Sequence, residues 1–411
     1  MKKKLWIINQ FANTIDMPGH TRQYDLSIFF RENGILVSVF SSDFNLSLRK
    51  FLRGQKRYFF KEEVVHGVKW IWLSVIQYNK NDWRRYLNIL SFNFVLFCQL
   101  FVRCLIGLVR RDKPDLILAS SPQLPAAFLS MVISKLYRIP FIFEVRDLWP
   151  KVLIEMGGFN KDSILIKLLS FMENSLYNNS TSVVVLSKGC IKYVKEKGAQ
   201  NVIFLPNGAN LKQFKFAPLP RENEIFSSER PFKIVYSGAH GEANGLENVI
   251  NAAHLLEDYP IRFYFIGDGP EKDKLKLLAY GMNSIVFEDP ISKNKIPHYL
   301  AKADAILISL SNLKLFSYGV SPNKLFDAYA IGRPVITTIP GLINDEVNKF
   351  KLGITSPPED PLKLASAIKT LYLKNREERE QMGRSARLIA EKYYSRELIS
   401  SKYLQLIKDL I

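Results

Sequence analysis

One stretch of the chain combines a helix start, a cation and a carboxylate: Ser321-Pro322-Asn323-Lys324-Leu325-Phe326-Asp327. Ser321 is a favoured N-cap residue, and Pro322 suits a first helical turn, where its missing N–H costs nothing. The free N–H groups of a helix start attract anions, and Lys324 adds a full positive charge. Asp327, about one turn later, is placed to accept hydrogen bonds from sugar hydroxyls. A phosphate grip beside such a carboxylate is what a nucleotide-linked sugar requires, although an ordinary capped helix with a solvated lysine has the same pattern.

Two predicted strand-to-helix turns in the same half of the chain carry glycine: Ser237-Gly238-Ala239-His240-Gly241 and Gly267-Asp268-Gly269-Pro270. Neither contains a full G-x-G-x-x-G, so a dinucleotide fingerprint is not supported. Because glycine has no side chain, a ligand can approach the backbone closely there. The candidate substrate-binding residues of this half are therefore Gly238, His240, Gly267, Asp268, Gly269, Ser321, Pro322, Asn323, Lys324 and Asp327.

A further candidate anion site follows the first predicted strand. The connection Asp16-Met17-Pro18-Gly19-His20-Thr21-Arg22 places a flexible glycine at a helix start, with basic residues following. In doubly wound sheets a ligand commonly binds at this position. Gly19 and His20 therefore join the candidates, although a lone glycine is a weak signal.

Apolar runs that alternate with helical patterns must position these residues. Their both-faces-buried character predicts largely parallel sheets covered by helices. The predicted strands are Leu5–Asn9, Ile35–Ser41, Val68–Leu73, Asp115–Ser120, Phe141–Val145, Val183–Ser187, Val202–Leu205, Lys233–Tyr236, Ile261–Ile266, Ile285–Glu288, Ala305–Leu310, Pro334–Thr338 and Leu352–Thr355. The fold class predicted is therefore α/β, with two doubly wound, Rossmann-like parallel-sheet domains facing a cleft.

The 411 residues suffice for two domains of ordinary size. We expect an N-terminal domain over 1–210, a linker over 206–231 with prolines and little periodicity, and a second domain over 232–392. A last helical pattern over 393–411 is expected to cross back to the first domain.

The composition favours an anionic partner. Lys and Arg total 57 against 39 Asp and Glu, which gives a net charge of +18. Such a surface suits nucleic acid, anionic lipid or a phosphorylated substrate, but no nucleic-acid-binding motif is visible. The three cysteines form no C-x-x-C pair, which favours a reducing compartment, and the five histidines lack metal-ligand spacing. No cofactor and no metal is predicted.

The stretch 86–109 raises the question of a membrane. It is largely apolar, but Asn88, Asn93, Gln99 and Arg103 interrupt it, whereas a spanning helix wants about 20 mostly apolar residues. Basic residues flank it on both sides. A helix packed on a sheet is the favoured interpretation, and an interfacial helix on anionic lipid stays open.

The chain resembles the retaining sugar-nucleotide glycosyltransferases of family 4, which have the two-Rossmann architecture called GT-B. The resemblance covers essentially the whole chain and is nearest to the O-antigen and capsule subgroup that includes the L-fucosamine transferase WbuB. The motifs that carry it are Phe141-Ile142-Phe143-Glu144-Val145-Arg146-Asp147-Leu148-Trp149-Pro150, Ser321 to Asp327, Gly332-Arg333-Pro334-Val335, Pro206-Asn207-Gly208 and the Gly267 turn. The resemblance implies that the second domain binds the nucleotide sugar and the first receives the acceptor.

The chain departs from the family pattern at five positions. The family's E-x7-E motif falls on Gly319 and Asp327, so Asp327 inherits the ribose-binding role and Gly319 inherits none. The two cations that usually bind the diphosphate fall on Ala239 and Asn244, which leaves Lys324 as the best cation. A histidine common in the family falls on Arg146.

The chemistry of breaking a sugar–diphosphate bond selects the remaining candidates. Charge stabilisation at the leaving group is the largest help a protein gives, and no D-x-D motif is present to hold Mg²⁺. We therefore expect metal-independent turnover. The resemblance implies same-face attack with retention. Arg146, Asp147 and Glu144 are the catalytic candidates, although a structural ion pair between Glu144 and Arg146 explains their presence equally well.

The leading hypothesis is an enzyme that moves a hexose or an amino-deoxyhexose such as L-fucosamine from a UDP- or GDP-linked donor. The resemblance implies a glycan acceptor on undecaprenyl diphosphate, and a cytoplasmic protein peripheral on the inner face of an anionic membrane. Two alternatives stay open: a GT-B epimerase acting on the nucleotide sugar itself, and a degenerate protein that binds a sugar nucleotide without turnover. Nucleic-acid binding is the weakest candidate.

Overall fold

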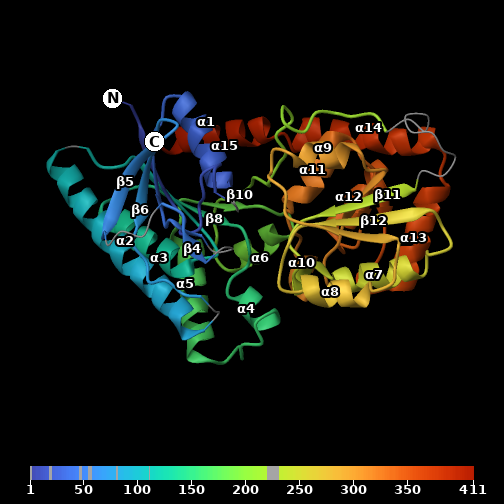
Figure 1. Cartoon of the computed structure of the whole chain (residues 1–411). Helices are drawn as coiled ribbons and strands as arrows, with labels where there is room; N and C mark the ends of the chain where they lie inside the picture. The colour runs from blue at the N-terminus through green and yellow to red at the C-terminus, as the bar shows by residue number, and fades with distance from the viewer. Residues whose placement is uncertain are drawn as a thin grey trace. The chain divides into compact units, whose positions relative to one another are not determined.

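The computed structural model describes residues 2–17, 21–45, 49–53, 58–79, 82–110, 112–219 and 231–411. The chain forms two compact units, each with its own sheet (Figure 1). The first unit holds Met1–Leu186, Cys190–Leu205 and Ser400–Ile411, and the second holds Ser187–Gly189 and Pro206–Ile399. The end of the last helix thus belongs to the first unit, and the predicted linker residues up to 219 belong to the second.

The described part of the first unit is built on a sheet in the order β10-β9-β8-β7-β1-β2-β6-β5. Its pairs are parallel, except that β5 runs antiparallel to β6. The strands are β1 (Lys4–Ile8), β2 (Leu36–Ser41), β5 (Phe60–Val65), β6 (Val68–Leu73), β7 (Leu116–Ser120), β8 (Phe141–Val145), β9 (Ser182–Val185) and β10 (Val202–Phe204), with a small pair β3 (Phe44–Asn45) and β4 (Lys50–Phe51). The helices are α1 (Arg22–Glu32), α2 (Trp83–Val109), α3 (Leu124–Leu136), α4 (Lys151–Glu155), α5 (Ile164–Asn179), α6 (Cys190–Glu196) and the end of α15 (Arg396–Leu410).

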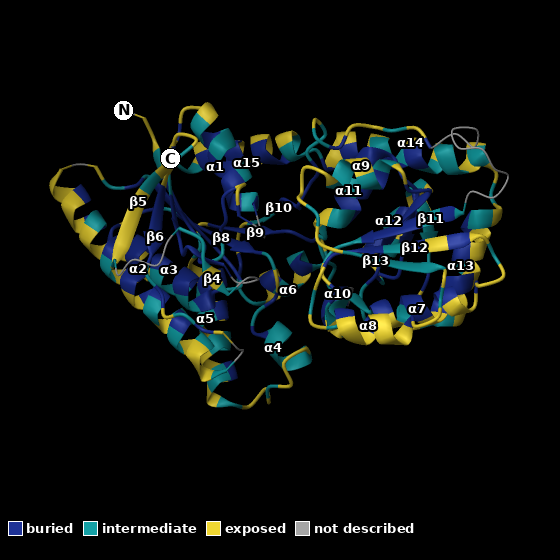
Figure 2. Cartoon of the chain, viewed as in Figure 1, coloured by how far each residue is buried: buried dark blue, intermediate teal, exposed yellow. Residues whose placement is uncertain are grey.

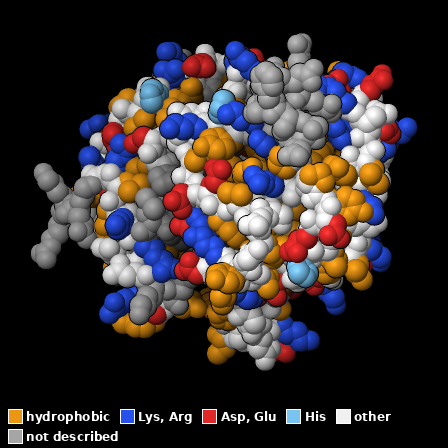
Figure 3. Space-filling view, turned by 45° about the vertical axis from the view of Figure 1, so that its right-hand side comes forward, with side chains coloured by type: hydrophobic (Ala, Val, Ile, Leu, Met, Phe, Trp, Pro, Cys, Tyr) orange, Lys and Arg blue, Asp and Glu red, His pale blue; other side chains and the backbone are white. Residues whose placement is uncertain are grey.

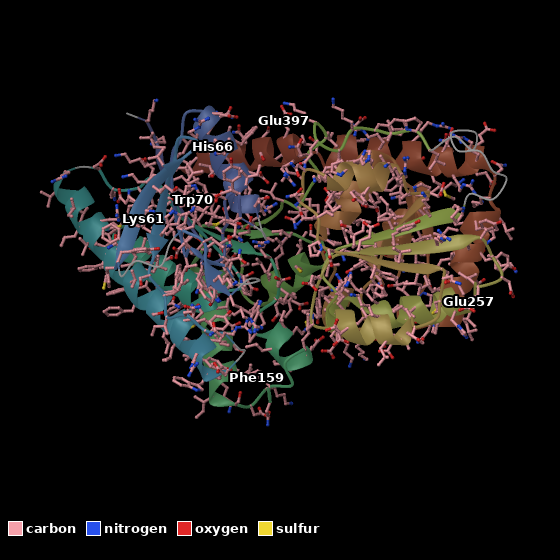
Figure 4. All side chains as sticks on the ribbon, viewed as in Figure 1. Lys61, His66, Trp70, Phe159, Glu257 and Glu397 are labelled. Carbon is pink, nitrogen blue, oxygen red and sulfur yellow. The ribbon has the colours of Figure 1, made fainter. Side chains whose placement is uncertain are left out.

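The central strands of this sheet are buried on both faces, as their apolar runs predict (Figure 2). Successive side chains of β6 point to opposite faces of the sheet, so Trp70 (labelled in Figure 4) and Trp72 share a face. Their rings stack there with centroids 4.9 Å apart. The end of α15 closes the unit, because Tyr403 is buried and its ring lies 5.8 Å from that of Phe30.

The second unit has a fully parallel sheet in its described residues, in the order β13-β12-β11-β14-β15-β16. The strands are β11 (Phe232–Ser237), β12 (Ile261–Ile266), β13 (Ile285–Glu288), β14 (Ala305–Ile308), β15 (Val335–Thr337) and β16 (Gly353–Thr355). The helices are α7 (Leu246–His254), α8 (Lys272–Leu278), α9 (Ile296–Ala301), α10 (Lys314–Ser317), α11 (Asn323–Ile331), α12 (Leu342–Phe350), α13 (Pro361–Leu373), α14 (Arg376–Tyr393) and the start of α15. One core cluster joins the sheet to α11, α12 and α14, and another joins it to α7, α8 and α13. Helices therefore cover both faces, and the prediction of doubly wound α/β domains is confirmed.

The sequence-based prediction missed β5 and the β3–β4 pair. Strand β5 reads Phe60-Lys61-Glu62-Glu63-Val64-Val65 and lies at the sheet edge with most of its residues exposed. A charged edge strand has neither the continuous apolar run nor the clean alternation from which strands are predicted.

Candidate active site

The helix α11 starts without a side-chain cap. It begins at Asn323, and its N-cap residue is Pro322. The prediction that Ser321 caps this helix and that Pro322 stands in its first turn is therefore wrong. The hydroxyl of Ser321 instead accepts a hydrogen bond from the backbone N–H of Asn207 at 2.9 Å, and the Asn207 side-chain amide donates to the Ser321 carbonyl at 2.7 Å. The first N–H groups of α11 thus keep their capacity to bind an anion.

Lys324 stands in the first turn of this helix without a carboxylate among its described hydrogen-bond partners. Its ammonium group donates to the Tyr236 hydroxyl at 2.9 Å and to Asn244 Oδ1 at 3.1 Å, and it lies 4.2 Å from the centroid of the Tyr236 ring. Burial lowers the pKa of Lys324 to about 7. A desolvated ammonium group with only neutral partners favours the approach of an anion.

The contact with Asn244 lies at one of the positions where the chain departs from the expected family pattern. The resemblance described above implies a diphosphate-binding cation at the position of Asn244, and the Lys324 ammonium donates a hydrogen bond to the Asn244 side chain from α11. The other such position, Ala239, has no side-chain polar group, but its carbonyl accepts a hydrogen bond from the Tyr236 hydroxyl at 2.7 Å. The positive charge of this loop therefore comes from a different element of the fold.

Asp327 lies one turn further along α11 and is half-buried. Its Oδ1 atom is buried and accepts no hydrogen bond from the described residues. Burial raises the pKa of this carboxyl to about 6, although Arg396 and Lys293 oppose the shift. An unsatisfied carboxylate oxygen on the helix that carries Lys324 fits a partner with hydroxyl donors.

The two glycine turns pack against each other. A Cβ at Gly267 would lie 2.0 Å from the Gly238 carbonyl oxygen, and one at Gly269 would lie 2.3 Å from the His240 carbonyl oxygen. These two glycines thus serve the close packing of backbone on backbone. Gly238 differs, because a Cβ there would lie 3.0 Å from the Lys324 ammonium. Of the three, Gly238 is the one beside the candidate anion site.

His240 and Asp268 are placed differently from each other. The His240 ring is fully buried, neither ring nitrogen has a hydrogen-bond partner among the described residues, and the rings of Tyr236, Phe265 and Phe287 surround it. Burial, with help from nearby lysines, lowers its pKa to about 4. His240 is therefore a neutral core residue of the turn. Asp268 is exposed and accepts a hydrogen bond from the Gly269 N–H.

In the first unit, a polar network joins the end of β8 to the start of α1. Glu144 is fully buried, and it accepts hydrogen bonds from Arg22 Nε at 3.0 Å, Gln23 Nε2 at 3.2 Å and Ser120 Oγ at 3.1 Å. The ion pair of Glu144 is therefore with Arg22, and the hypothesis of a Glu144–Arg146 pair is wrong. Arg146 makes a long contact of 3.5 Å from its guanidinium to Gln23 Oε1. Gln23 thus links the two candidates.

Asp147 follows Arg146 with an exposed side chain. The backbone N–H groups of both residues donate to Ser121 Oγ, at 2.8 Å from Arg146 and 3.2 Å from Asp147. This hydroxyl fixes the turn after β8.

Gly19 and His20 lie outside the described residues.

The sequence did not predict a site role for Tyr236, Asn207, Arg22 or Gln23. Arg22 had a weak signal, as a basic residue at a helix start, and Tyr236 had one as a polar aromatic residue near the end of a strand. No group of three or more His, Cys, Asp or Glu side chains within the ranges given above is placed to hold a metal ion.

Two family models match the chain, one in each half. "Glycosyl transferase 4-like domain" matches residues 31–208, and "Glycosyl transferases group 1" matches residues 221–389. Both halves of the chain are thus matched to glycosyltransferase domains.

Similar proteins span part of the chain. The chain is 25% identical over 321 residues to the probable glycosyltransferase WbjE of Pseudomonas aeruginosa. This match covers 74% of the chain and 76% of WbjE. The chain is 29% identical over 239 residues to the Escherichia coli K12 protein WcaI, described as a putative colanic acid biosynthesis glycosyl transferase, and this match covers 56% of the chain and 58% of WcaI. The solved structure of Anabaena HepE in complex with UDP-glucose matches with a TM-score of 0.67 at 14% identity, over 99% of both chains.

Proposed function

The chain belongs to the GT-B glycosyltransferases, and from this premise we propose that it transfers a sugar from a nucleotide donor, held by the second unit, to a lipid-linked acceptor. The observation that carries the proposal is the Lys324 ammonium group at the uncapped start of α11, which has no carboxylate partner within the described ranges. The diphosphate of the donor supplies the missing negative charge. Asp327, on the same helix, accepts hydrogen bonds from the ribose hydroxyls.

In the proposed reaction the bond between the sugar C1 and the diphosphate oxygen breaks, and the acceptor hydroxyl oxygen bonds to C1. The proton of that hydroxyl passes to the leaving diphosphate. Attack from the face that the leaving group departs retains the configuration at C1. Lys324 and the α11 N–H groups stabilise the negative charge that develops on the leaving group.

We propose that the turn after β8 holds the acceptor. Asp147 is exposed and available to accept a hydrogen bond from the acceptor hydroxyl, and Arg146 is available to a phosphate. Glu144 is fully buried and bonded to Arg22, Gln23 and Ser120, so it acts by positioning Arg146 through Gln23.

The likeness to WcaI, which is described as a putative colanic acid biosynthesis glycosyl transferase, supports a role in the synthesis of a bacterial polysaccharide. We propose a deoxy or amino sugar such as L-fucosamine as the transferred group and undecaprenyl diphosphate as the carrier. Likeness to HepE bound to UDP-glucose favours UDP over GDP in the donor. The enzyme then works in the cytoplasm, on the inner face of the membrane. On the face drawn in Figure 3, basic side chains are mixed with acidic and apolar ones, which does not favour a nucleic-acid stripe.

The test is incubation of the full chain with a panel of UDP- and GDP-sugars and a lipid extract that contains undecaprenyl-linked glycans, with and without EDTA. We expect transfer from a UDP-sugar that persists in EDTA. If EDTA abolishes turnover, the expectation of metal-independent catalysis is wrong. If no donor is bound or consumed, the proposal fails.

One observation favours a second candidate, a protein that binds the donor without turnover. The first carboxylate of the family's E-x7-E motif is replaced by Gly319, whose backbone φ of +83° favours glycine. Binding of UDP that depends on Lys324, without transfer or hydrolysis of any donor, supports this candidate. A changed nucleotide sugar formed without any acceptor supports an epimerase.

A further inference from the structure

The helix α2 presents apolar side chains to solvent as well as to the core of its unit. A row of eight apolar or aromatic side chains, which we call the α2 row, is exposed at spacings of three and four residues: Trp83, Tyr86, Leu90, Phe94, Phe97, Phe101, Leu105 and Leu108. Such spacing places them on one face of a helix. Figure 2 shows exposed residues along the length of α2. Leu90 is 63% and Phe94 is 65% exposed. Apolar residues scattered singly on a surface need no explanation, but a continuous exposed apolar row marks an interaction site.

The polar residues that interrupt this apolar stretch point to the rest of the unit. The buried Asn88 accepts a hydrogen bond from the Gln10 side chain at 2.8 Å and donates to the Ile76 carbonyl at 2.7 Å. Arg103 donates to Gln99 at 3.0 Å and pairs with Glu62 at 2.6 Å.

These contacts decide how α2 can meet a membrane. Among the described residues it is the one helix long and apolar enough to cross a membrane by length and composition. Spanning would break its hydrogen bonds to the folded unit and would pull Phe92, Leu96 and Leu100, all fully buried, out of the core. Lying flat on a bilayer keeps every one of these contacts and covers only the α2 row.

Basic side chains stand at both ends of the row. Arg84 is exposed beside Trp83, with its guanidinium 5.7 Å from the Trp83 ring centroid, and Arg110 is exposed after the last turn. The helix α3, which packs beside α2, adds exposed Val132 and Leu136 with the basic Lys135 between them. Aromatic rings next to arginines suit the headgroup region of an anionic bilayer.

The same charges argue against a second copy of the chain on this face. In an antiparallel pairing of two α2 rows, Arg84 of one copy would approach Arg110 of the other, and a parallel pairing would bring like arginines together. Like charges that meet at an apolar interface weaken it. An anionic lipid surface instead complements both ends of the row.

We propose that the α2 row is a docking surface for an anionic lipid bilayer, on which α2 lies parallel to the membrane plane. This inference deepens the proposed function, on which it rests, because it names the surface at which a lipid-linked acceptor is met.

The test is co-sedimentation of the full chain with vesicles of 70% phosphatidylcholine and 30% phosphatidylglycerol, and with pure phosphatidylcholine vesicles. We expect binding to the anionic vesicles that weakens as salt is raised, because exposed charges are screened. The variant Leu90→Asp/Phe94→Asp should bind the anionic vesicles at least about tenfold more weakly, since it puts two charges into the apolar contact. The matched control is Leu277→Asp in α8 of the second unit, where Leu277 is 77% exposed, and it should bind as the unchanged chain does.

Circular dichroism verifies that each variant is folded, and Leu90→Ser/Phe94→Ser replaces the charged pair if that one does not fold. The proposal is overturned if the unchanged chain does not bind anionic vesicles, or if the folded α2 variants bind as well as the control. It is also overturned if the unchanged chain is a dimer in sedimentation velocity and the α2 variants are monomers. UDP binding is measured on the same samples. A chain that binds vesicles but not UDP contradicts the proposed donor site and leaves the docking surface standing. A chain that binds UDP but not vesicles contradicts only the docking surface.

Discussion

Replacing Lys324 with methionine separates a ligand-binding role from a structural one. The Lys324 ammonium has two neutral hydrogen-bond partners and the Tyr236 ring, and its burial lowers its pKa to about 7. Because the folded state disfavours the charged form of this lysine, the charge of Lys324 lowers the free energy of unfolding. This cost is full below about pH 7 and fades as the pH rises toward the unfolded pKa of the lysine. Methionine keeps the length and apolar stem of the side chain without the charge. We therefore expect an unfolding midpoint unchanged or raised at pH 7.

Loss of UDP binding should accompany this unchanged stability. One charge-assisted hydrogen bond to the diphosphate is worth about 1.5–3 kcal/mol, which corresponds to a Kd increase of roughly 10- to 150-fold. Isothermal titration calorimetry with UDP measures the affinity, and differential scanning calorimetry measures the stability. A variant that unfolds several degrees earlier, yet binds UDP with an unchanged Kd, would refute the assignment of Lys324 to the diphosphate.

Four further outcomes are expected. UDP binding should take up a proton above pH 7, where Lys324 of the free protein is partly neutral, so the affinity for UDP should fall as the pH rises from about 7 to 9. Calorimetric titrations in buffers of different ionisation enthalpy measure the proton uptake. A Kd that does not depend on pH contradicts this prediction. Asp327→Asn should weaken UDP about tenfold but not lower stability at pH 7, because burial raises this carboxyl's pKa to about 6 and its ionised form is a cost; an equal loss for UDP and for uridine analogues lacking ribose hydroxyls would argue against ribose binding. Glu144→Gln should cost about 3–5 kcal/mol of unfolding free energy in urea, since it leaves a buried guanidinium without its carboxylate; a loss below 1 kcal/mol would show that the pair is screened. Gly238→Ala should weaken UDP binding because the methyl group crowds the ammonium, whereas Gly241→Ala, whose Cβ meets one atom at 3.8 Å, should bind UDP normally; equal Kd values for the two variants contradict the geometry.

The largely parallel sheets and the helices that cover them followed from patterns that the sequence displays directly, whereas the strand order was not predicted. Runs such as Leu116–Ser120 and Phe141–Val145 are buried along their whole length, and this is why their apolar character predicted a parallel, covered sheet. The charged edge strand Phe60–Val65 lacked that signal, because its side chains face solvent.

The candidate site was harder to predict, because it depends on which side chains meet across distant segments. Spacing placed Lys324 and Asp327 one turn apart, which the helix α11 fixes. Spacing could not show that the Ser321 hydroxyl is used by Asn207, 114 residues away, or that Glu144 pairs with Arg22, 122 residues away. A glycine's role is equally hidden, because Gly267 and Gly238 look alike in the sequence and only the fold shows that one packs against the other's carbonyl.

The central claim is that the donor's diphosphate lies against the first turn of α11 and is neutralised by Lys324. A crystal structure of the full chain with UDP tests it most directly. The account predicts a phosphate oxygen within hydrogen-bond distance of Lys324 Nζ and of an N–H in the first turn of α11, with the ribose at Asp327. A diphosphate bound elsewhere, with the Lys324 ammonium still held only by Tyr236 and Asn244, would contradict it.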